Sequence, residues 1–130
     1  MKEKGHLMTY EEFFSKVKSS LSIGKVLPNP GGGTSKILSI TEANITYQRG
    51  LSPISISVKT LYDLYKKYSG KTVSSTDLKA YLPKIFDQKY NGHPCNCTFF
   101  FMVLKEIGVV QRIRGEGKAY HPFYVDLPVT

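Results

Sequence analysis

Both cysteines of the chain and one of its histidines lie within five residues of one another, in the stretch NGHPCNCTFFFM at positions 91–102. Four such ligands can hold a structural zinc ion, and His93, Cys95 and Cys97 would need a fourth ligand such as His121. Zinc sites usually separate paired cysteines by roughly two to four residues, because C-x-C brings the thiolates awkwardly close for one tetrahedral ion. We therefore expect no metal and no cofactor, with these four residues as the alternative ligand set.

Cys97 is also a candidate nucleophile, because the helix dipole stabilises a thiolate near a helix N-terminus. His93 or His121 would then act as its base. No wider signature of a thiol enzyme accompanies these residues, and free cysteines in small domains are commonly buried. We favour the interpretation that Asn96 caps a helix starting near Thr98, while a cysteine and the phenylalanines enter the core.

The sequence Glu116-Gly-Lys118 has the E-x-K spacing of metal-dependent nucleases, whose carboxylates bind Mg²⁺. Those enzymes need a further acidic ligand, and none of the ten acidic residues forms a convincing partner for Glu116. The glutamate also lies between two glycines, which indicates a turn. We expect no catalytic residue, and a small nuclease-like enzyme that depends on a metal, Cys or His is kept as an alternative.

The chain is strongly basic. Its 18 Lys and Arg against 10 Asp and Glu give a net charge of +8, and most of the excess lies between Lys59 and Tyr120. A basic domain of this kind favours a polyanionic partner, most commonly nucleic acid. We expect binding to DNA, with duplex favoured and RNA as the other possibility. A protein-interaction domain for an acidic partner is a further alternative.

We expect a cytoplasmic protein without a membrane partner. No apolar run approaches the roughly 18 residues that span a bilayer. The first residues, MKEKGHLMTYEEFF, carry acidic side chains where an export signal needs a long apolar stretch. Cysteines spaced C-x-C cannot staple a domain, which favours a reducing compartment. The oligomeric state is not predicted.

The order of patterns predicts an α+β fold, with residues 1–130 forming one domain. Thr9 and Glu12 form a capping box for a helix at about 9–21. A loop rich in Gly and Pro follows at 24–36. Alternation of apolar and polar residues then predicts an antiparallel meander of three strands at 37–58, and 59–130 reads as three helices and a β-hairpin.

Within the last part, we expect a helix from Lys59 to Tyr68 and a second helix capped by Ser74 or Ser75. Pro83 breaks that second helix, because it lacks an N–H and clashes with the preceding turn. The third helix ends near Ile107. A hairpin of two strands then turns at the glycines flanking Glu116.

The pattern VSSTDLKAYLP followed by CNCTFFFMVLKEIGVVQRIRGEG resembles winged-helix (winged helix-turn-helix) DNA-binding modules, including those attached to restriction and other defence enzymes. The likeness covers about half of the chain and concerns the arrangement of elements. It implies DNA contacts from the wing at Arg112, Arg114 and Lys118, and from the third helix at Thr98 and Lys105. TFFFMVLKEI departs from the pattern because it is apolar nearly all round, so base contacts are expected from the N-terminus of that helix, the preceding loop or the wing.

Further candidate contacts follow from charge and position. Gln111 lies beside the basic wing residues, and Arg49 falls at a turn of the predicted meander. Lys66, Lys67 and Lys71 cluster at the end of one helix. The site predicted from sequence is therefore a basic surface built mainly by the last third of the chain.

Overall fold

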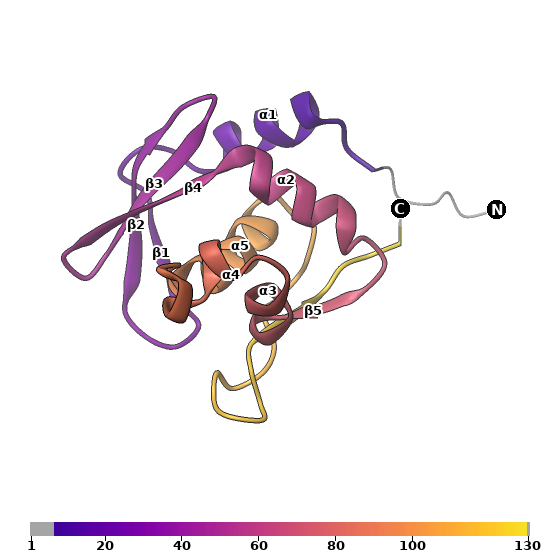
Figure 1. Cartoon of the computed structure of the whole chain (residues 1–130). Coiled ribbons are helices and arrows are strands. Elements are labelled where there is room, and N and C mark those ends of the chain that lie inside the picture. Colours follow the sequence, from indigo (N-terminus) through magenta and orange to yellow (C-terminus); the bar gives the residue numbers. More distant parts are fainter. Residues whose placement is uncertain (1–6, 130) are drawn as a thin grey trace.

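Helix α5 (Cys95–Glu106) runs through the middle of the molecule, and the other elements are arranged around it (Figure 1). The computed structural model describes residues 7–129 and has the mixed α+β architecture expected from the sequence. The other elements, in chain order, are α1 (Tyr10–Ser20), β1 (Val26–Pro28), β2 (Thr34–Ile40), β3 (Asn44–Arg49), β4 (Ser52–Ser57), α2 (Val58–Lys67), β5 (Thr72–Ser74), α3 (Ser75–Tyr81), α4 (Pro83–Phe86), the 3₁₀ helix η1 (Gln88–Tyr90) and β6 (Tyr124–Asp126).

The first helix forms as the sequence predicts. The Thr9 side chain accepts a hydrogen bond from the Glu12 N–H, and the Glu12 carboxylate accepts one from the Thr9 N–H. This capping box satisfies backbone donors that would otherwise lack partners at the start of α1. Phe13 and Val17 bury one face of the helix.

The sheet has four antiparallel strands in the order β1-β2-β3-β4, not the three expected. The predicted loop at 24–36 was wrong at both ends, because Val26–Pro28 forms a strand and β2 already begins at Thr34. The new edge strand pairs Leu27 with Ser35, and the glycines between the two strands close the hairpin. A three-residue strand ending in proline carries too little alternation to be recognised from sequence. The turns predicted after β2 and β3 are confirmed.

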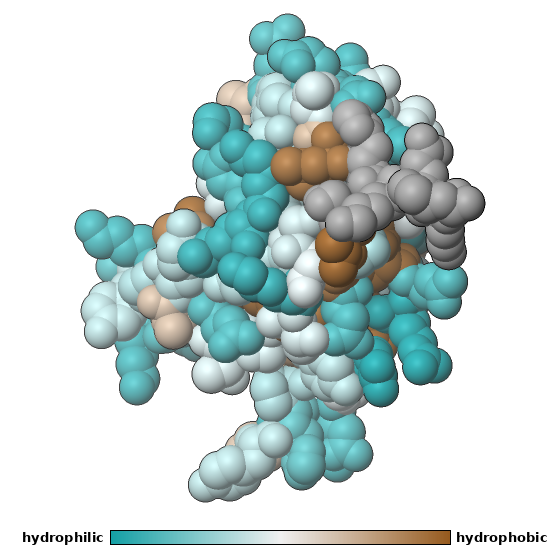
Figure 2. Space-filling view, turned by 90° about the vertical axis from the view of Figure 1, so that its right-hand side faces the viewer, coloured by the Kyte–Doolittle hydropathy of each residue, from teal (hydrophilic) through white to brown (hydrophobic). Residues whose placement is uncertain are grey.

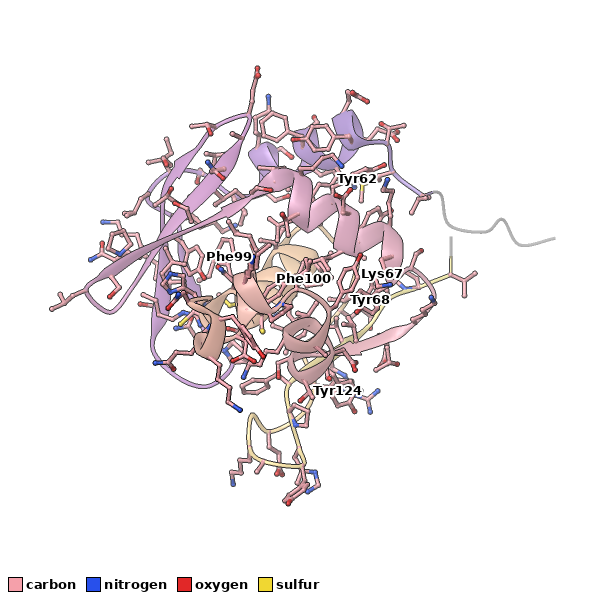
Figure 3. All side chains as sticks on the ribbon, viewed as in Figure 1. Tyr62, Lys67, Tyr68, Phe99, Phe100 and Tyr124 are labelled. Atoms are coloured by element: carbon pink, nitrogen blue, oxygen red, sulfur yellow. The ribbon has the colours of Figure 1, made fainter. Side chains whose placement is uncertain are left out.

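The core is one cluster of buried side chains to which the sheet and the helices contribute. Phe99, Phe100 and Phe101 are all fully buried, as the sequence predicts. In Figure 3, Phe99 and Phe100 lie in the interior between the sheet and the helices. The Phe99 ring stacks on Tyr47 of β3, with 3.8 Å between ring centroids. The sheet therefore covers one flank of α5.

The C-terminal elements follow the order α2, β5, α3, α4, α5 and β6. Ser74 caps α3 in a capping box with Asp77, and the helix breaks at Pro83, as expected. The predicted hairpin is only partly formed. β6 pairs with β5 instead of with a long neighbouring strand, and a single bridge joins Arg114 to Tyr124. Several glycines and Pro122 interrupt any regular ladder here.

The irregular loop between α5 and β6 projects from the body of the molecule, at the bottom of Figure 1. In the rotated view of Figure 2 the same projection stands out at the bottom and is coloured mainly from teal to white. It is therefore a hydrophilic extension of an otherwise tightly packed unit. Within residues 7–129, no helix has the length and apolar character needed to cross a bilayer.

Candidate nucleic-acid interface

Helix α5 begins three residues earlier than expected, and the prediction that Asn96 caps it is wrong. Pro94 occupies the cap position without a side-chain hydrogen bond, and Asn96 lies inside the first turn, only 2% exposed. Its Oδ1 accepts a hydrogen bond from the Tyr47 hydroxyl at 2.7 Å, and its Nδ2 donates to the Ile85 carbonyl oxygen at 3.2 Å. Asn96 therefore ties the sheet and α4 to the start of α5.

Cys97 is a core residue, as favoured from sequence. It is 1% exposed, and its thiol donates to the Ser75 carbonyl oxygen at 3.8 Å. Burial raises the pKa of Cys97 to about 12, so the thiolate that a nucleophile needs is strongly disfavoured. The alternative zinc ligands His93, Cys95, Cys97 and His121 do not converge, since no group of three His, Cys, Asp or Glu side chains among residues 7–129 is placed to hold a metal.

Glu116 lies exposed in the projecting loop, and its backbone N–H donates to the His121 carbonyl oxygen. The loop closes through a bridge between Lys118 and His121. Gly115 has φ +91°, and a Cβ there would lie 2.1 Å from the Pro122 oxygen, so the backbone requires glycine at this position. The E-x-K pair thus belongs to a tight turn, and Glu116 is part of no group of three His, Cys, Asp or Glu side chains among residues 7–129 that could hold a metal.

Phe123 stands at the base of the projecting loop, where three surface hollows meet. The first has a volume of about 370 Å³ and is bounded by the start of α3, the start of α5 and the loop. The second, of about 380 Å³, lies between the β1–β2 hairpin and the end of β3. The third, of about 350 Å³, lies between β1, the end of α5 and the loop. We call the surface formed by these hollows the Phe123 face.

The Phe123 face carries five cationic side chains and one carboxylate. The cations are Lys79, Lys118, Arg49, Lys105 and Arg112, and the carboxylate is Glu106.

The single carboxylate on this face does not offset the cations, because the Glu106 carboxylate already pairs with Lys25 at 2.9 Å. None of the five cations forms an ion pair with another residue of the described range 7–129. The face therefore presents a concentrated positive charge to solvent.

Five residues proposed from sequence lie on this face, coming from the sheet, α5 and the loop: Arg49, Thr98, Lys105, Arg112 and Lys118. Arg114 and Gln111 do not line the hollows. Arg114 instead pairs with Asp126 at 3.2 Å and lies over the Tyr124 ring. The loop thus divides its basic residues between the Phe123 face and the β6 side.

The lysines at the end of α2 form a separate group. Lys66 lies over the Tyr62 ring, and Lys67 lies over Tyr81 with 4.3 Å between the Nζ atom and the ring centroid. Lys71 is exposed beyond the helix. In Figure 3, Lys67 and Tyr68 lie beside α2, well above the projecting loop. The structure does not bring these three lysines onto the Phe123 face.

Sequence reasoning missed Lys79, Phe123 and the glycines of the β1–β2 hairpin as parts of one surface. For Lys79 a signal existed, because it follows Ser75 by four residues and therefore lies on the same face of α3 as Ser75. The glycine-rich stretch is itself a signal for contact with a DNA phosphate, although a plain hinge was the favoured interpretation. Phe123 carries no such signal, and only the packing of β1 against β2 brings 29–34 beside the loop.

No known protein family, no curated protein and no solved structure matches the chain.

Proposed function

We propose that this chain is a DNA-binding module that contacts duplex DNA through the Phe123 face. The observation that carries the proposal is the gathering of five cations without carboxylate partners around three adjoining hollows. Cations of this kind bind the phosphate backbone and release condensed counterions, which supplies most of the non-specific affinity for DNA. The hydroxyl groups of Ser75 and Thr76 add hydrogen-bond donors between them.

The mode of contact differs from that of an ordinary recognition helix. Both flanks of α5 are buried, from Asn96 to Leu104, so the helix cannot lie lengthwise in the major groove. Its first turn, near Pro94 and Thr98, and its last turn, with Lys105 and Glu106, border the Phe123 face. We therefore propose that α5 contributes only a few polar side chains near its two ends, such as Thr98 and Lys105, and that the projecting loop acts as the wing. Most contacts then fix position on the backbone and carry little sequence information.

A duplex suits the Phe123 face better than a single strand. Binding of single strands without sequence preference relies on aromatic side chains on which successive bases stack. Tyr120, at 97% exposure, is the fully exposed aromatic side chain that borders the hollows, while Phe123 is half-buried. Among residues 7–129 the face thus offers charge and few stacking platforms.

The order α2, β5, α3, α5, loop and β6 supports a winged-helix-like interpretation of this part of the chain. In that interpretation β5 and β6 form the sheet at the base of the wing. The four-stranded sheet that covers α5 is an addition to it. A role in a defence, restriction or regulatory system is part of the proposal and rests on the resemblance alone.

The test is fluorescence anisotropy of a labelled duplex at a series of salt concentrations. The double variant Arg112→Ala and Lys118→Ala should bind more weakly, and its plot of log K against log salt should be shallower by roughly two phosphate contacts. The control is Lys16→Ala with Lys18→Ala, which removes the same charge from α1, away from the Phe123 face. Equal slopes of log K against log salt for both double variants would show that the wing does not contact DNA.

Competition assays separate the alternative partners. Unlabelled single-stranded DNA, duplex RNA and polyglutamate are added to the protein–duplex complex at one fixed salt concentration. We expect unlabelled duplex DNA to compete best, because spaced phosphates match the cations of the Phe123 face. Equal competition by polyglutamate would contradict the proposal and favour an acidic protein partner.

A further inference from the structure

Arg49 lies half-buried at the end of β3, where neutral groups alone hold its guanidinium. Its Nε donates to the Ser35 hydroxyl at 3.0 Å, and its Nη1 donates to the Thr98 hydroxyl at 2.8 Å. Its Nη2 contacts the Met102 sulfur at 3.7 Å, and the guanidinium carbon lies 5.7 Å from the centroid of the Tyr47 ring. These bonds fix the guanidinium between the sheet and the first turn of α5.

The charge on Arg49 has no counter-ion. A guanidinium carries five N–H donors, of which three are engaged here, so at least one donor on each of Nη1 and Nη2 has no acceptor among residues 7–129. No carboxylate pairs with it in the described range 7–129. A cation taken partly out of water normally has a partner, because desolvating an uncompensated charge costs free energy. An anionic ligand is the partner that this geometry lacks.

The hollow beside Arg49 offers further donors to such a ligand. Its wall is the glycine-rich turn between β1 and β2, and within residues 7–129 the N–H groups of Gly31 and Gly33 have no hydrogen-bond acceptor. These two N–H groups flank that of Gly32, which donates to the Asn29 carbonyl oxygen at 3.1 Å, and exposed backbone N–H groups in turns commonly bind anions. Only Arg49 contributes a charge to the lining of this hollow. Its volume of about 380 Å³ is ample for one phosphate group.

A short chain of hydrogen bonds holds the glycine turn in register with the guanidinium. Ser35, which accepts from Arg49, donates to Asn29 Oδ1 at 2.6 Å. Asn29 Nδ2 in turn donates to the Gly32 carbonyl oxygen at 3.3 Å. Ser35 is fully buried, whereas the bond from Asn29 to Gly32 at the other end of the connection is exposed. The donors on the two sides of the hollow are thereby preorganised.

We propose that this hollow is a phosphate-binding site in which Arg49 and the N–H groups of the glycine turn hold one phosphate group. This inference deepens the proposed function. Where the bound phosphate belongs to the backbone of duplex DNA, the inference rests on that proposed function. A free phosphate or a nucleotide offers the same chemistry. Bidentate hydrogen bonds from guanidinium to phosphate and a backbone nest are both well suited to this group.

The first arm of the test uses inorganic phosphate alone. Titration followed by ¹H–¹⁵N NMR should shift the backbone signals of Gly31 and Gly33 and the Nε signal of Arg49, in a saturable manner. Arg49→Lys keeps the charge, loses the planar fork and should bind phosphate about tenfold more weakly. Because Arg49 also joins β3 to α5, a second variant that leaves these bonds intact is needed.

Gly31→Asp is that variant, with Gly31→Asn as its matched control. Gly31 does not have a positive φ, and a Cβ there would lie 3.6 Å from the Phe123 ring, an ordinary contact. The two substitutions differ by one charge at nearly the same volume. Asp should weaken phosphate binding about tenfold relative to Asn, since a carboxylate beside the hollow repels the anion.

The second arm measures duplex binding by the same pair of variants. If Gly31→Asp lowers DNA affinity and flattens the salt dependence by roughly one phosphate contact relative to Gly31→Asn, a backbone phosphate occupies the site. If phosphate binding falls while duplex binding stays equal, the site exists and its ligand is a free phosphate or nucleotide. The site would be overturned if the wild type showed no saturable NMR shifts with phosphate, or if Gly31→Asp and Gly31→Asn bound phosphate equally well. Either result would leave the test of Arg112 and Lys118 unaffected.

Discussion

The side-chain amide of Asn96 connects three parts of the molecule. It is buried, accepts from the Tyr47 hydroxyl and donates to the Ile85 carbonyl oxygen. Sequence reasoning treated it as a helix cap, because Asn near a helix start most often serves that role. Which partner an asparagine finds depends on residues 11 and 49 positions away, and no local pattern contains that information.

Asn96→Ala should therefore destabilise the protein by more than the loss of a cap. Removing the amide leaves the Tyr47 hydroxyl buried without a partner and takes one of two hydrogen bonds from the Ile85 carbonyl, which still accepts from the His93 N–H. The free energy of unfolding should fall by roughly 2–4 kcal/mol, against about 1 kcal/mol for a cap. Urea unfolding of Asn96→Ala, Tyr47→Phe and the double variant measures this. Additive single effects would show that the two side chains do not interact.

Cys97 gives stability a dependence on alkaline pH. Burial raises its pKa from 9.0 to about 12, so the unfolded chain loses the thiol proton at a lower pH than the folded one. The protonated thiol therefore contributes to the free energy of unfolding. That contribution is complete below about pH 9 and is lost as the pH rises towards 12, at about 1.4 kcal/mol per pH unit. Burial also raises the pKa of Tyr47, which adds a loss in the same direction at higher pH.

The comparison of wild type with Cys97→Ala isolates the thiol. Between pH 8 and pH 10.5 the wild type should lose about 1–2 kcal/mol more unfolding free energy than the variant. Urea titrations at both pH values provide the measurement. Parallel losses in the two proteins would mean that the thiol is accessible to solvent in the folded state.

At the scale of elements, α5 is the centre of the core. It contributes Phe99, Phe100 and Phe101, all fully buried, and the sheet and the other helices pack around it. A helix that is apolar on all sides has to be covered on all sides. The sequence predicted this burial because no polar stripe interrupts the segment.

Phe100→Ala should lower the free energy of unfolding by about 3–5 kcal/mol, through lost transfer free energy and a cavity. Phe100→Leu keeps most of the volume and should cost about 1 kcal/mol. The control is Leu51→Ala at the tip of the β3–β4 hairpin, where the side chain is 95% exposed, and its effect should stay within about 0.5 kcal/mol. If Phe100→Ala melts like the wild type, α5 is exposed in solution.

Elements with strong local signals were predicted well, and those fixed by distant pairing were not. The capping boxes at Thr9 and Ser74 and the break at Pro83 are encoded within a few residues, and all three are present. Strand β1 was missed because it exists through pairing with β2. The expected hairpin near Gly115 forms only two isolated bridges, Arg114–Tyr124 and Lys118–His121, since β6 finds its partner in the distant strand β5.

For the whole molecule, the distribution of charge matters more than its sum. The net charge of +8 already predicted a polyanionic partner, but it did not identify a surface. Folding places Arg49, Lys79, Lys105, Arg112 and Lys118 around Phe123 and leaves the lysines of α2 against tyrosine rings. The candidate residues were thus partly predictable from sequence, whereas their grouping depends on how the β1–β2 hairpin meets the loop.

A lysine footprint tests the central proposal that duplex DNA binds the Phe123 face. The free protein and its complex with duplex DNA are briefly acetylated, and modification at each lysine is quantified by mass spectrometry. Lys79, Lys105 and Lys118 should be protected by DNA, because they line the three hollows, whereas Lys16 and Lys18 on α1 should react equally in both samples. Uniform protection of all lysines, or protection confined to Lys66, Lys67 and Lys71, would contradict the account.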